Sequence, residues 1–222
     1  MYQAISVFDM FKIGVGPSSS HTLGPWRAAQ SFCSFLEEND LLDRTIKVTI
    51  LLYGSLAKTG KGHGTDLAVQ LGLCGLDPVT VDTSGLDALI KQIHQSGKLK
   101  LNGRMDIPFN PASDIHFLFS ESLPYHPNGL SFLAEIEDGE SVSQTYYSIG
   151  GGFIEQEGRK ITESDQPDLP FPINTANDLL HWCMKTGMSL HEIVLENELA
   201  WRSESKTRER VSEIWKVMKE CI

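Results

Sequence analysis

The chain has 222 residues and a formal net charge of −10 at pH 7, and we expect no nucleic-acid binding because a phosphate backbone would repel so acidic a protein. No apolar run approaches the roughly 20 residues that span a bilayer, and the N-terminus lacks the basic and apolar stretches of a signal peptide, so no membrane partner is expected. Apolar residues make up 41% of the chain, which is enough for a sizeable core.

The cysteines are spread along the chain and lie inside apolar helical patterns, at Cys33, Cys74, Cys183 and Cys221. This pattern is typical of reduced cysteines in a cytosolic protein, so we expect a cytoplasmic location. No CxxC motif or Cys/His cluster is present in the sequence. We therefore expect no metal to be held by this chain alone.

The first candidate site is a polar run, Ser18–Thr22, which follows two glycines and a proline. Residues 5–12 before it predict a short apolar helix or strand, and apolar residues at helical spacing predict a helix from Pro25 to Glu38. The polar run therefore lies at a helix N-terminus, where free N–H groups and the helix dipole favour a carboxylate or phosphate. The alternative is that Ser20 or Thr22 only caps the helix.

The second candidate site follows Thr45–Tyr53, whose β-branched and nearly continuous apolar composition predicts a central strand. The glycine-rich loop after it, residues 54–66, opens onto another predicted helix, with Thr65 or Asp66 as the cap. His63 stands between two glycines in this loop, which let the backbone approach a ligand and leave the imidazole free to act as a general base. The alternative is a surface histidine in a flexible loop.

The middle of the chain predicts a helix over residues 86–97, a short strand at 99–101, a loop over 102–114 and a strand at 115–119. Two further strands, Leu130–Ile136 and Val142–Ile149, flank the hairpin signal Asp138-Gly139. This hairpin brings Asn128 and Gly150 to the same end of the ribbon, where their loops are expected to line one pocket. The alternative is that His126 and Asn128 only shape a proline turn.

The last quarter of the chain predicts helices throughout residues 174–222, with Asn174 or Thr175 capping the first and Ser189 the second. We predict a domain over residues 1–158, a linker over 159–173 rich in charge and proline, and a helical segment over 174–222. The predicted fold class is α+β, with a mixed or antiparallel sheet of about four to five strands, helices on one face, and a helical C-terminal segment.

Four motifs together resemble a known family. They are Gly16-Pro17-Ser18-Ser19-Ser20-His21-Thr22, Gly62-His63-Gly64-Thr65-Asp66, His126-Pro127-Asn128 and Gly150-Gly151-Gly152-Phe153. In this order and spacing they are similar to the N-terminal, or beta, region of the iron–sulfur L-serine dehydratases (L-serine deaminases). The likeness covers about residues 3–160, and the helical tail looks like the beginning of the family's alpha domain.

The resemblance implies an enzyme that converts L-serine to pyruvate and ammonia without pyridoxal phosphate. In that family a [4Fe-4S] cluster, held by three cysteines of the alpha domain, acts as Lewis acid on the leaving hydroxyl. Cys183 and Cys221 do not show the expected ligand context, so the cluster is not expected in this chain. The chain is expected to be a truncated piece of a fused enzyme, inactive alone, whose partners are L-serine, the catalytic alpha domain and a second copy in a homodimer.

The same resemblance implies roles for individual residues. His63 is the candidate base for the α-proton of serine. Ser18, Ser19, Ser20, His21 and Thr22 are expected to hold the carboxylate or the amino group, and Gly64, Thr65 and Asn128 are further substrate-binding candidates. The alternative function is a regulatory module that binds L-serine, because the family's beta region resembles the allosteric substrate-binding domain of some phosphoglycerate dehydrogenases.

Overall fold

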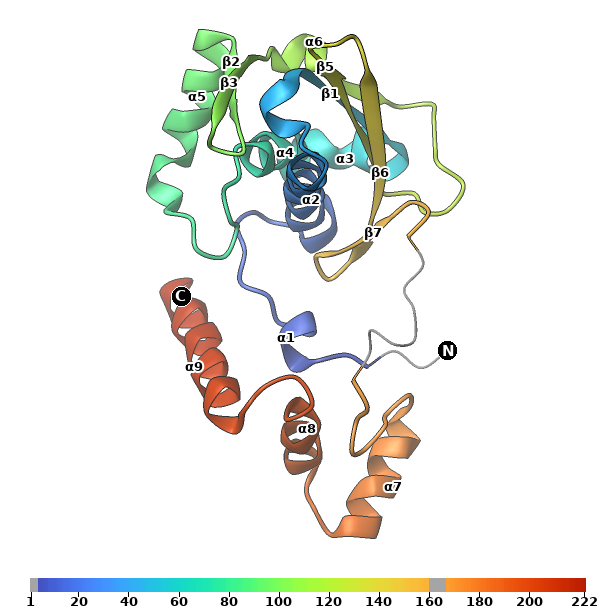
Figure 1. Cartoon of the computed structure of the whole chain (residues 1–222). Helices are drawn as coiled ribbons and strands as arrows, with labels where there is room; N and C mark the ends of the chain where they lie inside the picture. The colour runs from blue at the N-terminus through green and yellow to red at the C-terminus, as the bar shows by residue number, and fades with distance from the viewer. Residues whose placement is uncertain (1–3, 160–166) are drawn as a thin grey trace. The chain divides into compact units, whose positions relative to one another are not determined.

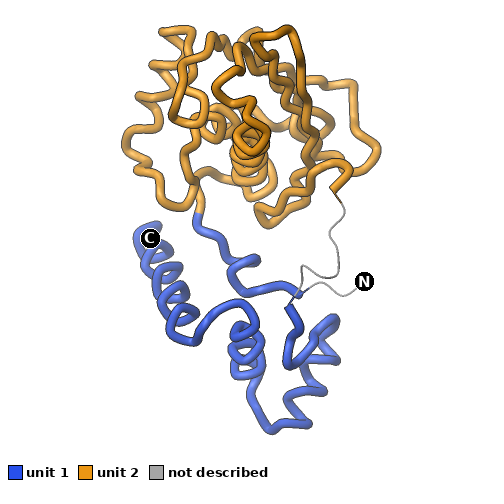
Figure 2. Tube along the Cα trace, viewed as in Figure 1, with its two compact units in different colours: residues 1–13, 160–222 blue, residues 14–159 orange. Residues whose placement is uncertain are grey.

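The computed structural model describes residues 4–159 and 167–222, and its chain divides into two compact units (Figure 2). We call residues 14–159 the sheet unit, and residues 1–13 with 160–222 the helical unit. The residues before Gly14 thus group with the C-terminal helices, whereas the sequence counted them with the first domain. Much of the predicted linker, residues 160–166, lies outside the described residues, so the exact domain boundaries remain a prediction.

The sheet unit contains a mixed sheet of five strands in the order β4-β1-β5-β6-β7 (Figure 1). The strands are β1 (Thr45–Tyr53), β4 (Ile115–Leu118), β5 (Gly129–Ile136), β6 (Ser141–Gly150) and β7 (Phe153–Gln156). β1 pairs with β4 in parallel and with β5 antiparallel, and the β5–β6 and β6–β7 pairs are antiparallel. The predicted sheet, its central strand and the β5–β6 hairpin are therefore confirmed.

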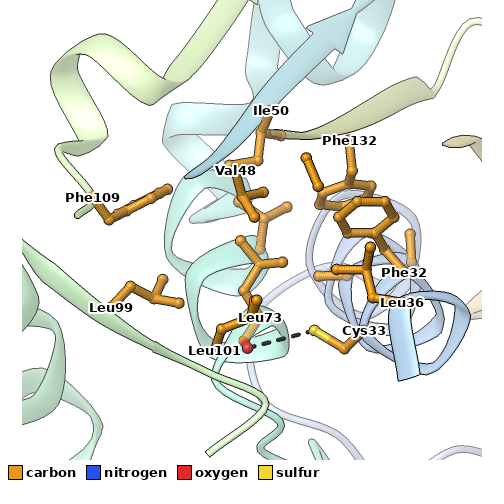
Figure 3. Close-up of a cluster of buried hydrophobic side chains, with 14 of the residues drawn as sticks. Phe32, Cys33, Leu36, Val48, Ile50, Leu73, Leu99, Leu101, Phe109 and Phe132 are labelled. Atoms are coloured by element: carbon orange, nitrogen blue, oxygen red, sulfur yellow. Dashed lines mark hydrogen bonds between the residues drawn. The ribbon is translucent and has the colours of Figure 1, made fainter. Parts of the chain in front are cut away.

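Helices cover one face of this sheet, as predicted. The core face of β1 presents Val48, Ile50 and Leu52, each fully buried, because alternate side chains of a strand point to the same side. They pack with helices α2 (Gly24–Glu38) and α4 (Thr65–Leu73) in one apolar cluster (Figure 3). Phe32 of α2 stacks on Phe132 of β5 with ring centroids 5.1 Å apart, so the first predicted helix is fixed against the sheet.

The segment predicted as a loop over residues 102–114 is instead partly regular, which corrects the sequence prediction. β2 (Lys98–Leu101) and β3 (Met105–Pro108) form a separate antiparallel hairpin, followed by the short helix α6 (Pro111–Asp114). The turn is Asn102-Gly103, both with positive φ, a strong hairpin signal that polar flanks obscured. Leu99 and Ile107 face each other across it and are buried.

Short helical turns carry the polar motifs of the sheet unit. The turn η1 (Ser19–Leu23) leads directly into α2, and α3 (Gly54–Thr59) with η3 (Gly60–His63) follows β1 and leads to α4. The remaining elements of this unit are η2 (Leu42–Arg44), η4 (Thr83–Gly85) and α5 (Leu86–Ser96). Both predicted sites thus lie where a loop enters a helix.

The helical unit contains α1 (Val7–Met10), α7 (Ala176–Thr186), α8 (Leu190–Glu198) and α9 (Glu204–Glu220). Thr175 and Ser189 begin α7 and α8 as capping boxes, so the predicted helical segment and its caps are confirmed. Within residues 4–159 and 167–222, no helix combines the length and apolar character needed to cross a membrane.

Candidate functional site

The serine turn, Ser18–Thr22, is a wide helical turn that extends α2 backwards. Ser18 is its cap: the Ser18 Oγ accepts a hydrogen bond from the His21 N–H at 3.1 Å. The Gly24 N–H bonds to the Ser19 carbonyl, which is the spacing of a π-turn, a feature frequent at functional sites. The prediction that Ser20 or Thr22 caps the helix is therefore wrong, because the helical run starts before both residues.

Two hydroxyl groups from other elements hold this turn by its carbonyls. Pro25 has no N–H, so it cannot donate to the carbonyls of Ser20 and His21, which it would otherwise reach in a π-turn or an α-turn. The Ser148 Oγ of β6 donates to the Ser20 carbonyl at 2.7 Å, and the Thr65 Oγ1 of α4 donates to the His21 carbonyl. The proline thus converts two helix carbonyls into attachment points for β6 and α4.

The turn that carries His63 is attached to the serine turn as well. The Thr22 Oγ1 donates to the His63 carbonyl at 2.8 Å, and the ring centroids of His21 and His63 are 5.0 Å apart. Gly64, with φ of +65°, begins α4 as its cap. The predicted cap, Thr65 or Asp66, is wrong because only glycine adopts this left-handed backbone without strain, and the Thr65 hydroxyl bonds to His21 instead.

His63 is held in one tautomer. Its Nδ1 lies 2.9 Å from the carbonyl oxygen of Thr59. Because a carbonyl can only accept, Nδ1 carries the hydrogen and Nε2 of the neutral ring carries the lone pair. The side chain is half-buried, so this lone pair is suited to accept a proton from a bound molecule.

His21 lies between two serine hydroxyls. Its Nδ1 is 2.9 Å from the Ser20 Oγ, and its Nε2 is 3.0 Å from the Ser55 Oγ of α3. Burial lowers the pKa of His21, the nearby charge of His63 lowers that pKa further, and a hydrogen bond with the Ser55 backbone raises it. The net lowering favours the neutral ring, so His21 adds little positive charge beside His63 near neutral pH.

The loop with His126, Pro127 and Asn128 meets two of the elements that touch the serine turn, β6 and α3. The buried Asn128 side chain donates to the Ser148 carbonyl at 3.1 Å, and the Ser55 N–H donates to the Pro127 carbonyl at 2.9 Å. Asn128 therefore reaches the serine turn through Ser148, and it lies at the same end of the β5–β6 ribbon as Gly150, as predicted.

Two other features border this cluster. The Gly152 carbonyl accepts a hydrogen bond from Arg27 of α2 at 3.2 Å, which ties the triple glycine to the helix that the serine turn begins. A groove of about 580 Å³ is lined in part by Lys61 and Asp66, on either side of His63 along the chain, and by none of the predicted site residues. The predicted site is thus distinct from this groove.

The structure brings most of the predicted site residues into one connected cluster. Hydrogen bonds and a ring contact directly join Ser18, Ser20, His21, Thr22, His63 and Thr65, and Gly64 follows His63 in the chain. Asn128 is joined to them through Ser148, and Ser19 lies exposed in the same turn. Sequence reasoning missed Ser55 and Ser148. Ser55 follows the carboxyl end of the central strand, which is a signal for a site. Ser148 is a single serine between Tyr147 and Ile149 of a strand, and it gives no such signal. Among the described residues no group of three or more His, Cys, Asp or Glu is placed to hold a metal.

The chain is similar to proteins of one known family. The family model of the serine dehydratase beta chain matches residues 6–159. The chain is 45% identical to L-serine dehydratase of Streptomyces coelicolor (strain ATCC BAA-471 / A3(2) / M145), over 99% of this chain and 49% of the relative. It is 41% identical to L-serine dehydratase 1 of Escherichia coli (strain K12), over 98% of this chain and 48% of the relative.

A further relative, L-serine dehydratase of Helicobacter pylori (strain ATCC 700392 / 26695), is 37% identical over 98% of this chain and 48% of its own length. The chain spans about half the length of the curated relatives it matches. The matched family region, residues 6–159, contains all of the predicted site residues. On the family match and these identities together, the chain belongs to the serine dehydratase beta chain family.

Proposed function

We propose that this chain is part of an L-serine ammonia-lyase, which converts L-serine to pyruvate and ammonia, and that it supplies loops to the active site. The observation that carries the proposal is the His63 lone pair beside a serine turn at the start of a helix. The names of the relatives, which are L-serine dehydratases, support the same substrate.

The serine turn suits the carboxylate of an amino acid. The first N–H groups of a helical run have no carbonyl before them in that run, and Ser19 and Ser20 open this one. The helix dipole adds positive potential at the same end. In our proposal these N–H groups and the neighbouring hydroxyls hold the substrate carboxylate, while the Thr22 and Thr65 hydroxyls, bonded to backbone carbonyls, keep the turn in shape.

The proton step falls to His63. Its Nε2 takes the α-proton, the C–H electron pair forms a double bond between Cα and Cβ, and the Cβ–O bond breaks as the hydroxyl leaves. The enamine then becomes an imine, and water hydrolyses it to pyruvate and ammonia. The Thr59 carbonyl, bonded to Nδ1, stabilises the imidazolium that forms, and a neutral His21 avoids charge repulsion next to it.

Hydroxide is a poor leaving group, so the complete reaction needs an electrophile. The residues of this chain do not fit a [4Fe-4S] cluster: Cys33 and Cys74 are buried in the core and Cys221 is exposed, and no metal-binding group forms among the described residues. We therefore assign the cluster to a catalytic alpha domain outside this sequence, in a cytoplasmic homodimer that uses no pyridoxal phosphate. In this proposal the chain alone has no dehydratase activity.

The test is His63→Ala in a complete, cluster-loaded enzyme. Loss of a general base lowers turnover by about 10²- to 10⁴-fold, so kcat should fall by that factor while serine still binds. Exchange of the substrate α-proton with deuterium from solvent should stop. The control is His116→Ala, because His116 is an exposed histidine on the edge strand β4. Turnover of His63→Ala near that of the control would rule out His63 as the base.

The second candidate function is a regulatory L-serine site. It is favoured by one observation. The serine turn and the two neighbouring rings of His21 and His63, which we call the histidine pair, all lie within this chain. Calorimetry of the 222-residue chain with L-serine separates the two. Saturable binding, together with normal turnover of His63→Ala in the complete enzyme, would favour regulation.

A further inference from the structure

We propose that Ser55 is a positioning residue of the histidine pair, whose hydroxyl fixes the His21 ring so that only His63 offers a lone pair to the substrate. The proposal deepens the proposed function and rests on it for its kinetic consequence. Its structural part concerns hydrogen bonds that exist without substrate, so it can be tested separately.

Helix α3 anchors both histidines. The Ser55 Oγ lies 3.0 Å from Nε2 of His21, and the Thr59 carbonyl lies 2.9 Å from Nδ1 of His63. Ser55 and Thr59 are four residues apart, and therefore neighbours on one face of this helix. One short helix thus sets the 5.0 Å separation of the two rings.

The anchor itself is firmly held. The Ser55 N–H donates to the Pro127 carbonyl at 2.9 Å, and the Gly54 N–H donates to the Glu121 carbonyl at 2.8 Å. A side chain at position 54 would collide with the Pro127 carbonyl, because a Cβ there would lie 2.4 Å from it, and φ is +51°. Gly54 is therefore required for the close approach that presents Ser55 to His21.

The hydrogen bonds leave a free lone pair on only one of the two rings. Nε2 of His21 lies 3.0 Å from the Ser55 hydroxyl, and Nδ1 of His21 lies 2.9 Å from the Ser20 hydroxyl. Because one nitrogen of a neutral imidazole donates and the other accepts, these two hydroxyls together fix one tautomer of His21. His63 carries its hydrogen on Nδ1. Both nitrogens of His21 are occupied, and Nε2 of His63 is left to take the proton.

The first experiment measures the tautomers in the 222-residue chain by ¹⁵N NMR of the histidine rings, without substrate. We expect a single fixed tautomer for His21 and Nδ1–H for His63. In Ser55→Ala the His21 nitrogens should shift toward the averaged values of a mixed tautomer, and Ser55→Thr, which keeps the hydroxyl, should restore them. Ser120→Ala, in the exposed turn after β4, is the control.

The second experiment measures kinetics in the complete enzyme. Loss of an outer hydrogen-bond partner at a site typically costs about 10- to 100-fold in activity. Ser55→Ala should lower kcat by that factor, with KM within about threefold of wild type if ground-state binding is unchanged, and Ser55→Thr should recover most of the rate.

The outcomes separate the two proposals. Unchanged His21 nitrogen shifts in Ser55→Ala would overturn the role of Ser55, whatever the kinetics. The expected shifts together with normal turnover of His63→Ala would keep Ser55 as the anchor of His21 and would reject His63 as the base.

Discussion

Each of the two units is stabilised internally by a different kind of contact. The sheet unit has a large apolar cluster, built from α2, α4, the main sheet and the β2–β3 hairpin, and a smaller cluster around Trp26, Ala68 and Leu71. In the described part of the helical unit the fully or nearly buried apolar side chains are Phe8 and Ile193, and the other buried residues are polar: Ser6, Asn197, Glu198 and Thr207. Apolar burial therefore fixes the frame of the site, whereas the helical unit depends on directional polar bonds.

Glu198 is the centre of those polar bonds. Its carboxylate accepts from the Ser6 hydroxyl at 2.8 Å and from the Val7 N–H at 2.7 Å, and it pairs with Arg202. The guanidinium groups of Arg202 and Arg210 lie over the Phe8 ring, 4.6 and 4.3 Å from its centroid. The N-terminal segment is thus bonded to α8 and α9, which explains why it groups with them and not with the sheet unit that follows it.

The largest expected difference between the two units is in the reactivity of their cysteines, because each unit has two. Burial raises the pKa of Cys33 to about 12 and that of Cys74 to about 11, whereas Cys183 is half-buried and Cys221 is exposed. A rise from 9.0 to about 12 lowers the thiolate fraction of Cys33 about 1,000-fold. Iodoacetamide labelling followed by mass spectrometry should therefore modify Cys221 long before Cys33. Equal rates in the native protein would contradict the assignment of Cys33 to a closed core.

A substitution in the apolar core should lower the stability of the sheet unit alone. Phe132→Ala removes a fully buried ring stacked on Phe32 and should lower the free energy of unfolding by about 3–5 kcal/mol. Urea unfolding measures this loss, and Cys33 labelling should accelerate. Phe119→Ala is the matched control because that ring is 58% exposed. A loss for Phe132→Ala no larger than that for Phe119→Ala would contradict the role of this core.

Much of this frame was readable from the sequence. The apolar run of β1, the helical spacing of α2 and the Asp138-Gly139 turn are strong local signals, and each predicted element is present. The short strand β2 was predicted, but its partner β3 was missed because a four-residue strand offers too few residues for a periodic pattern. The grouping of α1 with α8 and α9 was also missed, since it depends on Glu198, which is distant in the sequence.

The candidate site was predictable only in part, for a related reason. Glycine-flanked polar loops mark the serine turn and His63, because such a composition is unusual before a helix. Ser55 and Ser148 are single serines beside apolar residues, and their importance comes from tertiary bonds to His21 and Ser20. The start of the serine turn at Ser18 depends instead on a local bond, in which the Ser18 side chain accepts from the His21 N–H.

The smallest expected effect concerns the polar centre of the helical unit. Glu198→Ala leaves Arg202 and the Ser6 and Val7 donors without their carboxylate. Breaking this ion pair should cost about 3 kcal/mol, the low end of the usual range for buried pairs, because Arg202 keeps some access to solvent. Hydrogen–deuterium exchange of residues 5–11 should accelerate, while Cys33 labelling should stay slow. Glu196→Ala is the control, since Glu196 is exposed on the same helix. Unchanged exchange of residues 5–11 in Glu198→Ala would mean that apolar contacts of Phe8 hold the segment, and faster Cys33 labelling would mean that the two units do not open independently.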